Sequence, residues 1–135
     1  MESIIKPKTL NKILVIDDDD IYNKIVAYSV LMIDPSIHLH VEKSVDKAIN
    51  HLLENDLPDL ILVDINMPSK SGYEFLKLYE KYFSNCENSP LIYIMTTSIL
   101  IADKIKAAEY NTVNGFKVKG DIFKILNEII SEGFS

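Results

Sequence analysis

The chain has 135 residues, of which 47% are hydrophobic and 25% charged, and this is the composition of one ordinary globular domain. Its formal net charge is −6 at pH 7, and all 14 basic residues are lysines. Without arginine for bidentate contacts, and with an acidic balance that repels phosphate backbones, the chain is not expected to bind nucleic acid.

Residues 1–12 are expected to be a flexible lead-in to a single domain of residues 13–132. That domain opens with a short, continuous apolar run at 13–16, and similar runs lie at 60–63 and 91–95. Runs of this length and composition predict strands that are covered on both faces.

Helical spacing of apolar residues marks the longer segments between these runs. The clearest stripes are Val45, Ala48, Ile49, Leu52 and Leu53; Phe75, Leu76, Tyr79 and Phe83; and Phe123, Leu126, Ile129 and Ile130. Ser71 and Glu74 form a capping-box pattern ahead of the second stripe. Segments 38–42 and 115–119 alternate apolar and polar residues, which is typical of strands at the edges of a sheet.

This alternation of strands and helices predicts an α/β fold with a five-stranded parallel sheet. The second and fifth strands belong at the edges. Right-handed crossovers then favour the strand order 2-1-3-4-5 of a doubly wound, flavodoxin-like (βα)5 fold. In such a sheet, ligands bind beyond the carboxyl ends of the strands where the order reverses, here between the first and third strands.

Cys86 is the only cysteine, which excludes an intramolecular disulfide and a cysteine-based metal site. No apolar run approaches the roughly 18 residues that a membrane span requires. The first apolar run is also too short for a secretory signal. We therefore expect a cytoplasmic protein without a membrane partner.

Carboxylates follow both strands at the point where the strand order reverses. Asp17 and Asp18 follow the first strand, and Asp64 follows the third. Because neighbouring strands lie about 4.8 Å apart, these carboxylates repel one another unless a cation neutralises them. Mg²⁺ prefers oxygen ligands and typically binds one or two carboxylates together with a phosphate. The sequence therefore predicts a Mg²⁺ site at this edge.

A hydroxyl and an ammonium group are expected at the same edge, because the fourth strand ends at Thr96 and Thr97 and the fifth at Lys119. Phosphoryl transfer depends mostly on positioning and charge neutralisation, so these groups suffice for a carboxylate to form an acyl phosphate. Each residue alone has an ordinary structural explanation. Asp19 and Asp20, for example, are interpreted as caps of the following helix.

From about residue 13 to residue 130, the chain resembles the receiver domain of two-component response regulators. The segments that carry the resemblance are 13–20 (ILVIDDDD), 58–68 (PDLILVDINMP) with Ser71 and Gly72 following, 94–96 (IMT) and 115–119 (GFKVK). Together, in this order and at compatible spacing, they form a specific signal. The chain departs from the family at Gly120, where a proline preceded by a cis peptide is usual, and we expect the Lys119–Gly120 bond to be trans.

The resemblance implies a phosphoacceptor that assists its own phosphorylation and dephosphorylation, and not an enzyme. It implies Asp64 as the phosphorylated residue. Asp18 would be a direct ligand of Mg²⁺ and Asp17 a water-mediated one. The backbone carbonyl of Asn66 would be a third protein ligand.

The resemblance also implies that Thr96 and Lys119 contact the phosphoryl group, and that Thr96 and Phe116 form a conformational switch. Asn66 and Ser98 occupy the two variable positions that tune the lifetime of the acyl phosphate. The implied partners are a histidine kinase or histidine phosphotransfer protein upstream and an unknown protein target downstream. We expect a stand-alone regulator that signals through these partners.

Three other hypotheses differ in their chemistry. A phosphatase of the haloacid-dehalogenase type also uses a strand-end aspartate and Mg²⁺, but its general acid would fall on Asn66, which has no titrating proton. A degenerate receiver would act as a binding module without phosphorylation, and would have no use for repelling carboxylates. An FMN-binding protein would need a phosphate cradle of small residues where the aspartates stand.

Overall fold

The computed structural model describes residues 9–84 and 86–134. Within them, five parallel strands form one sheet in the order β2-β1-β3-β4-β5, which confirms the predicted fold class and strand order. The strands are β1 (Lys12–Ile16), β2 (His38–Glu42), β3 (Leu60–Asp64), β4 (Leu91–Thr96) and β5 (Val113–Val118). They alternate with the helices α1 (Asp20–Ile33), α2 (Val45–Glu54), α3 (Gly72–Phe83), α4 (Ile101–Ala108) and α5 (Ile122–Gly133).

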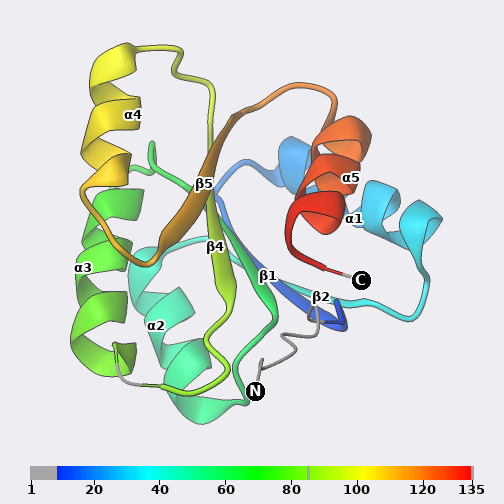
Figure 1. The fold of residues 1–135 in the computed structure, drawn as a ribbon, viewed down its shortest axis with the longest axis horizontal. Coiled ribbons are helices and arrows are strands. Elements are labelled where there is room, and N and C mark those ends of the chain that lie inside the picture. Colours follow the sequence, from blue (N-terminus) through cyan, green and yellow to red (C-terminus); the bar gives the residue numbers. More distant parts are fainter. Residues whose placement is uncertain (1–8, 85, 135) are drawn as a thin grey trace, which may run out of the picture.

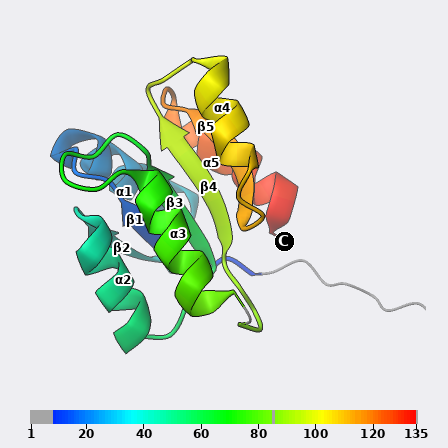
Figure 2. The same cartoon turned by 90° about the vertical axis from the view of Figure 1, so that its left-hand side faces the viewer.

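Helices cover both faces of the sheet. Helices α2, α3 and α4 lie on one face, and α1 and α5 lie on the other (Figure 1). Figure 2 looks onto the face that carries α2, α3 and α4. Because both faces are covered, every residue of the central strand β3 is buried, whereas the edge strand β2 is only partly buried.

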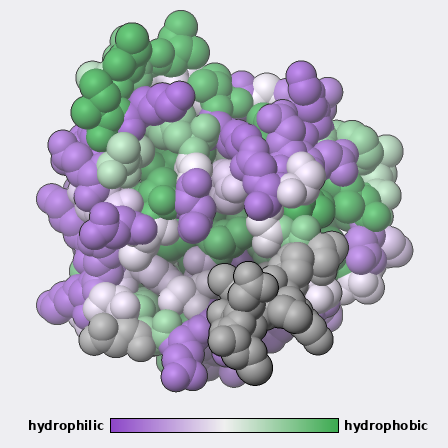
Figure 3. Space-filling model, in the orientation of Figure 1, coloured by the Kyte–Doolittle hydropathy of each residue, from purple (hydrophilic) through white to green (hydrophobic). Residues whose placement is uncertain are grey.

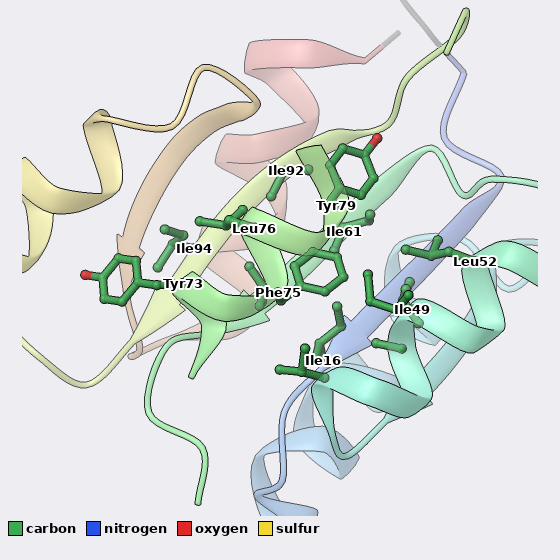
Figure 4. Close-up of a cluster of buried hydrophobic side chains, with 14 of the residues drawn as sticks. Ile16, Ile49, Leu52, Ile61, Tyr73, Phe75, Leu76, Tyr79, Ile92 and Ile94 are labelled. Atoms are coloured by element: carbon green, nitrogen blue, oxygen red, sulfur yellow. The ribbon is translucent and has the colours of Figure 1, made fainter. Parts of the chain in front are cut away.

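The larger core forms where α2 and α3 pack against the sheet. In Figure 4, Phe75 and Leu76 of α3 lie over the strands, and Phe75 is close to the α2 residue Ile49. The side chains of Phe75 and Leu76 are completely buried. Two residues of the predicted stripes lie outside the core: Leu53 is 54% exposed and Phe123 is 42% exposed. Both lie at the margin of an otherwise buried helical stripe.

Helix α1 begins within the row of aspartates. Asp19 is its N-cap, and its Oδ1 accepts hydrogen bonds from the N–H groups of Ile21 and Tyr22, at 3.1 Å each. Asp20 lies in the first turn and pairs with Lys43 at the surface. Of the two residues interpreted as caps, Asp19 therefore caps the helix and Asp20 does not.

Helix α3 begins in close contact with the end of β3. Ser71 is its N-cap residue, as predicted, but the Ser71 side chain makes no capping hydrogen bond; the N–H of Glu74 donates to the Ser71 carbonyl instead. The N–H of Gly72 donates to the carbonyl of Ile65 at 3.1 Å. A Cβ atom on Gly72 would lie 2.5 Å from the carbonyl oxygen of Asp64. The absence of a side chain thus lets the helix approach the backbone that carries Asp64.

The fold extends beyond both ends of the predicted domain. Leu10 is buried against the core on the α1 and α5 face, and Lys12 belongs to β1. Phe134, which follows α5, is buried in the same core. Residues 9–12 of the predicted lead-in are therefore part of the folded domain, and its residues 1–8 lie outside the described part of the chain.

No peptide bond in the described residues is cis, so the Lys119–Gly120 bond is trans, as predicted. None of the helices in this part of the chain combines the length and the apolar character that a membrane crossing requires.

Candidate functional site

Polar side chains from four strand ends meet at one edge of the sheet, which lies toward the top of Figure 1. Asp64 and Thr96 end β3 and β4, while Asp17 and Lys119 directly follow β1 and β5. Ligand oxygens of Asp17, Asp18 and Asp64 all lie within 4.8 Å of one another. We call these three carboxylates, together with Lys119, the acidic pocket.

Asp17 is held from three directions and is only 2% exposed. Its N–H donates to the carbonyl of Glu42 at 3.1 Å. Its Oδ1 accepts from the N–H of Asp19 at 3.0 Å, and its carbonyl accepts from the side-chain amide of Asn23 at 2.9 Å. Contacts with β2 and with the start of α1 therefore fix the position of the Asp17 carboxylate. Asp18, in contrast, is exposed.

Lys119 lies between two of the carboxylates. Its Nζ is 2.7 Å from Oδ2 of Asp17 and 3.5 Å from Oδ2 of Asp64. Its N–H donates to the carbonyl of Thr96 at 2.6 Å, which ties the end of β5 to the end of β4. Burial opposes the ammonium charge, but the hydrogen bond and charge of Asp17, followed by those of Asp64, outweigh it and raise the pKa of Lys119. The lysine is therefore a cation at neutral pH.

The carboxylate of Asp64 has a raised pKa. Burial, with a smaller contribution from the charge of Asp17, raises its pKa from 3.8 to about 6. The N–H of Asn66, which donates to Oδ1 of Asp64 at 3.1 Å, and the ammonium of Lys119 act in the opposite direction. These two donors do not fully compensate the desolvation of the carboxylate. The acidic pocket thus retains surplus negative charge at neutral pH.

The hydroxyl of Thr96 is completely buried beside the acidic pocket. Its Oγ1 accepts from the side-chain amide of Asn66 at 3.2 Å and from the N–H of Ser98 at 3.1 Å. In neither bond does the hydroxyl donate. Its proton can therefore serve an acceptor that enters the pocket.

Phe116 lies apart from the acidic pocket. It pairs with Ile94 across β4 and β5, and so faces the same side of the sheet as Thr96. It is partly buried against the core beneath α2, α3 and α4. It also lines a pocket of about 280 Å³ whose other residues are Ile99, Leu100, Ile101, Lys104 and Val118.

Two further residues touch the acidic pocket without being evident from the sequence pattern. The Nζ of Lys119 lies 4.5 Å from the ring centroid of Tyr22, at cation–π distance. Burial and the charges of Asp17 and Asp64 raise the pKa of Tyr22 to about 12. Asn23 is buried on the core-facing side of α1. In the sequence, a polar residue on the otherwise apolar face of this helix is the signal that could have identified Asn23.

Two exposed apolar surfaces adjoin this edge of the sheet. The first, which we call the α1 stripe, consists of Ile21, Ile25, Tyr28 and Met32. The second covers the start of α4 and consists of Ile99, Leu100 and Ile101. In Figure 3, apolar colour appears over the start of α4 at the upper left and over α1 on the right. Exposed apolar surfaces of this kind are typical of contact sites for other proteins.

Solved structures of response regulators are similar to this chain. A two-component response regulator from Cytophaga hutchinsonii aligns with a TM-score of 0.83 and 27% identity, over 93% of this chain and 97% of that chain. The Mn²⁺-bound form of response regulator Rcp1 aligns with a TM-score of 0.77 and 24% identity, over 90% and 92%. TrrA from Thermotoga maritima, in complex with Mg²⁺-BeF, aligns with a TM-score of 0.69 and 20% identity, over 91% and 98%. The last two similarities concern the fold alone.

A search of curated protein sequences finds no significant match. The sequence model of the response regulator receiver domain, however, matches residues 13–121, from the first strand to the residue that precedes α5. This match covers most of the chain and includes every residue of the acidic pocket. The chain therefore belongs to the family of response regulator receiver domains.

Proposed function

We propose that this receiver domain accepts a phosphoryl group on Asp64 from a phosphohistidine donor, with Mg²⁺ as cofactor, and signals through protein partners. The observation that carries this proposal is the placement of Asp64. It shares one pocket with two more carboxylates, Asp17 and Asp18, and lies 3.5 Å from the ammonium of Lys119. Membership of the receiver family supports the same function.

The acidic pocket fits Mg²⁺. It offers three carboxylates against one ammonium, and the raised pKa of Asp64 indicates that its negative charge is not fully compensated. Asp17, Asp18 and Asp64 would hold the ion, and the backbone carbonyl of Asn66 is proposed as a further ligand. When bound, Mg²⁺ neutralises phosphoryl oxygens beside the carboxylates. The Mg²⁺-BeF complex of TrrA and the Mn²⁺-bound form of Rcp1 support a divalent ion.

Asp64 acts as the nucleophile. One oxygen of its carboxylate forms a bond to phosphorus while the P–N bond of the phosphohistidine breaks. The bonding electron pair leaves on the imidazole nitrogen, which takes a proton from solvent. The products are an acyl phosphate on Asp64 and an unmodified histidine. Lys119 and the hydroxyl of Thr96 are proposed to bind the phosphoryl oxygens, so that the chain adds to the charge neutralisation and positioning that the metal supplies.

Thr96 and Phe116 are proposed to transmit the modification. Thr96 would move toward the phosphoryl group to which its hydroxyl donates, and this movement would weaken its present bonds with Asn66 and Ser98. That movement empties space on the side of the sheet where Phe116 lies. A shift of Phe116 would then reshape the pocket between β5 and the start of α4. The exposed apolar surface there is the proposed contact for the downstream protein.

The proposed donor is a histidine kinase or a histidine phosphotransfer protein. Helix α1 begins beside the acidic pocket, because its cap Asp19 also donates to Asp17. The α1 stripe follows from the first turn onward and remains exposed. An apolar helix face next to the acceptor suits a protein donor that must bring its phosphohistidine to Asp64.

Incubation with phosphoramidate and Mg²⁺, followed by intact mass spectrometry, tests the proposal. We expect one phosphoryl adduct that is absent with EDTA and absent in Asp64→Asn. Asp46→Asn is the matched control, because Asp46 is a surface aspartate that pairs with Lys70. An adduct that persists in Asp64→Asn would contradict the assignment. Sustained turnover of a phosphate ester would favour the phosphatase hypothesis, and a folded protein that takes no adduct would favour the binding module.

A further inference from the structure

All three histidines of the chain lie at one edge of the fold. His38 and His40 belong to the edge strand β2, and His51 belongs to α2. They line a groove of about 430 Å³. The receiver mechanism proposed above uses none of these residues.

The pleat of β2 accounts for this arrangement. His38, His40 and Glu42 alternate along the strand, so their side chains point to the same side of the sheet. The partners of His40 and Glu42 on β1 are Leu14 and Ile16, which belong to the core beneath α2 and α3. His40 and Glu42 therefore face α2 and not α1.

His40, Glu42 and His51 form a compact group, which we call the histidine cluster. Nε2 of His40 lies 2.6 Å from Oε2 of Glu42. The rings of His40 and His51 are stacked, with centroids 3.8 Å apart and planes within 9°. One ligand atom from each of the three residues lies within 4.8 Å of the other two.

We propose that the histidine cluster binds a divalent transition-metal ion of the Zn²⁺ class. Two imidazoles and one carboxylate are a donor set found in zinc sites with three protein ligands and an open fourth position. Imidazole suits Zn²⁺, Ni²⁺ and Cu²⁺ but not Mg²⁺, which prefers oxygen. The histidine cluster and the acidic pocket therefore differ in the ions that they select.

The distances are within reach of a metal centre. Tetrahedral coordination with bonds of about 2.0–2.2 Å places ligand atoms roughly 3.3–3.6 Å apart. The separations in the cluster, from 2.6 Å to at most 4.8 Å, bracket that range. The ring lone pairs lie in the ring planes, so the stack must open for both nitrogens to reach one ion. His40 can tilt, because its side chain is 48% exposed, while His51 contacts the Asn55 side chain.

The cluster is accessible, because His40 and His51 line the groove. Imidazole binds a metal in its neutral form. The side chain of Glu42 is 20% exposed, and the groove beside His40 and His51 is also lined by the charged residues Lys12 and Asp56. An ion can thus reach the cluster from solvent.

Calorimetric titration with ZnCl₂ tests this inference. The protein carries Cys86→Ser, because Cys86 is an exposed free thiol that binds zinc by itself. Saturating Mg²⁺ occupies the acidic pocket throughout. We expect one equivalent of Zn²⁺ to bind, with affinity reduced by about tenfold or more in His40→Gln and in His51→Gln. His38→Gln is the matched control, since His38 lines the same groove without belonging to the cluster, and should bind as the parent does.

Two results would overturn the inference. One is equal zinc affinity in the parent, His40→Gln and His51→Gln. The other is zinc binding that disappears under saturating Mg²⁺, which would place the ion in the acidic pocket. Thermal melting in EDTA shows whether each variant folds, and shifts of the imidazole NMR signals on zinc addition provide a second readout for the parent protein. Neither measurement depends on phosphorylation of Asp64.

Discussion

Among single side chains, Asp64 and Asp18 illustrate how burial divides the roles of neighbouring carboxylates. Both belong to the acidic pocket, yet Asp64 is 5% exposed and Asp18 is exposed to solvent. Water screens the charge of Asp18, whereas the buried negative charge of Asp64 is stabilised by Lys119 and by the N–H of Asn66. The cost of keeping like charges together therefore falls on the buried carboxylates, and the raised pKa of Asp64 reflects it.

Replacing Asp64 by asparagine should stabilise the metal-free protein at neutral pH. Because folding raises the pKa of Asp64 from 3.8 to about 6, the folded state binds the proton more tightly. This contribution to stability is present at low pH and is lost as the pH rises from about 4 to about 6. Urea unfolding in EDTA should show Asp64→Asn more stable than wild type by roughly 1–3 kcal/mol at about pH 7.5, with a smaller difference near pH 4.

Asp18→Asn is the control for this prediction. Asp18 is exposed, so its replacement should change the free energy of unfolding less than Asp64→Asn does. A wild-type protein that is as stable as Asp64→Asn at neutral pH would show that Lys119 already compensates the buried carboxylate completely.

Among the secondary-structure elements, the start of α3 lies directly against the backbone at the end of β3, which carries Asp64. Gly72 lies where a Cβ atom would meet the backbone of Asp64 and Ile65, at 2.5 Å and 2.8 Å. Backbone atoms at the end of a central strand cannot move aside as a flexible side chain can. Helix α3 can therefore begin here only with a residue that lacks a side chain.

Gly72→Ala should destabilise the protein although alanine favours helices. The steric conflict with β3 should cost about 1–3 kcal/mol, more than the gain in helix propensity, and urea unfolding measures the difference. Gly120→Ala is the matched control. A Cβ atom on Gly120 would come no closer than 4.0 Å to its nearest neighbour, the carbonyl oxygen of Val118, so a change of about 0.5 kcal/mol or less is expected. Equal stability of Gly72→Ala and wild type would mean that the start of α3 can shift away from β3.

In the molecule as a whole, two cores on opposite faces of one sheet hold the strand ends in register. Residues of β1, β3 and β4 contribute to both cores, so neither face can loosen without disturbing the other. The acidic pocket lies where the strands of this sheet end, and packing of the strands brings its three carboxylates together although they repel one another and only one ammonium, that of Lys119, lies among them. A ligand that relieves their repulsion should stabilise the entire fold.

Mg²⁺ should therefore raise the melting temperature of the protein. An ion that binds only the folded state adds about 2.7 kcal/mol at a concentration 100 times its Kd. The increase should exceed that in NaCl of equal ionic strength, and it should be largely lost in Asp64→Asn. Asp46→Asn, on the surface, should respond as wild type does. An equal response of Asp64→Asn would place the ion elsewhere.

The fold and the main residues of the acidic pocket could be predicted because they depend on patterns along the chain. A strand that is buried on both faces must be continuously apolar, and β3 is. The ends of parallel strands meet at one edge, so Asp17 and Asp64, on the neighbouring strands β1 and β3, had to lie close to each other once the strand order was known. Lys119 follows the edge strand β5, and its long side chain reaches both carboxylates. Burial of the sheet between two layers of helices and the handedness of crossovers suffice to predict the fold and the edge of the sheet at which these residues lie.

Other features depend on contacts between side chains that are distant in sequence. In the sequence, Asp19 and Asp20 are equivalent candidates for the N-cap of α1. Only the structure shows that Asp19 accepts the capping hydrogen bonds. Tyr22 meets Lys119 because the long side chain of Lys119 reaches across the strand ends to Asp17 and to the first turn of α1. His40 and His51 stack because α2 packs over an edge strand. The periodicity of the sequence predicts which face of a helix or strand is buried. Which side chains come into contact on that face depends on how the neighbouring helices and strands pack.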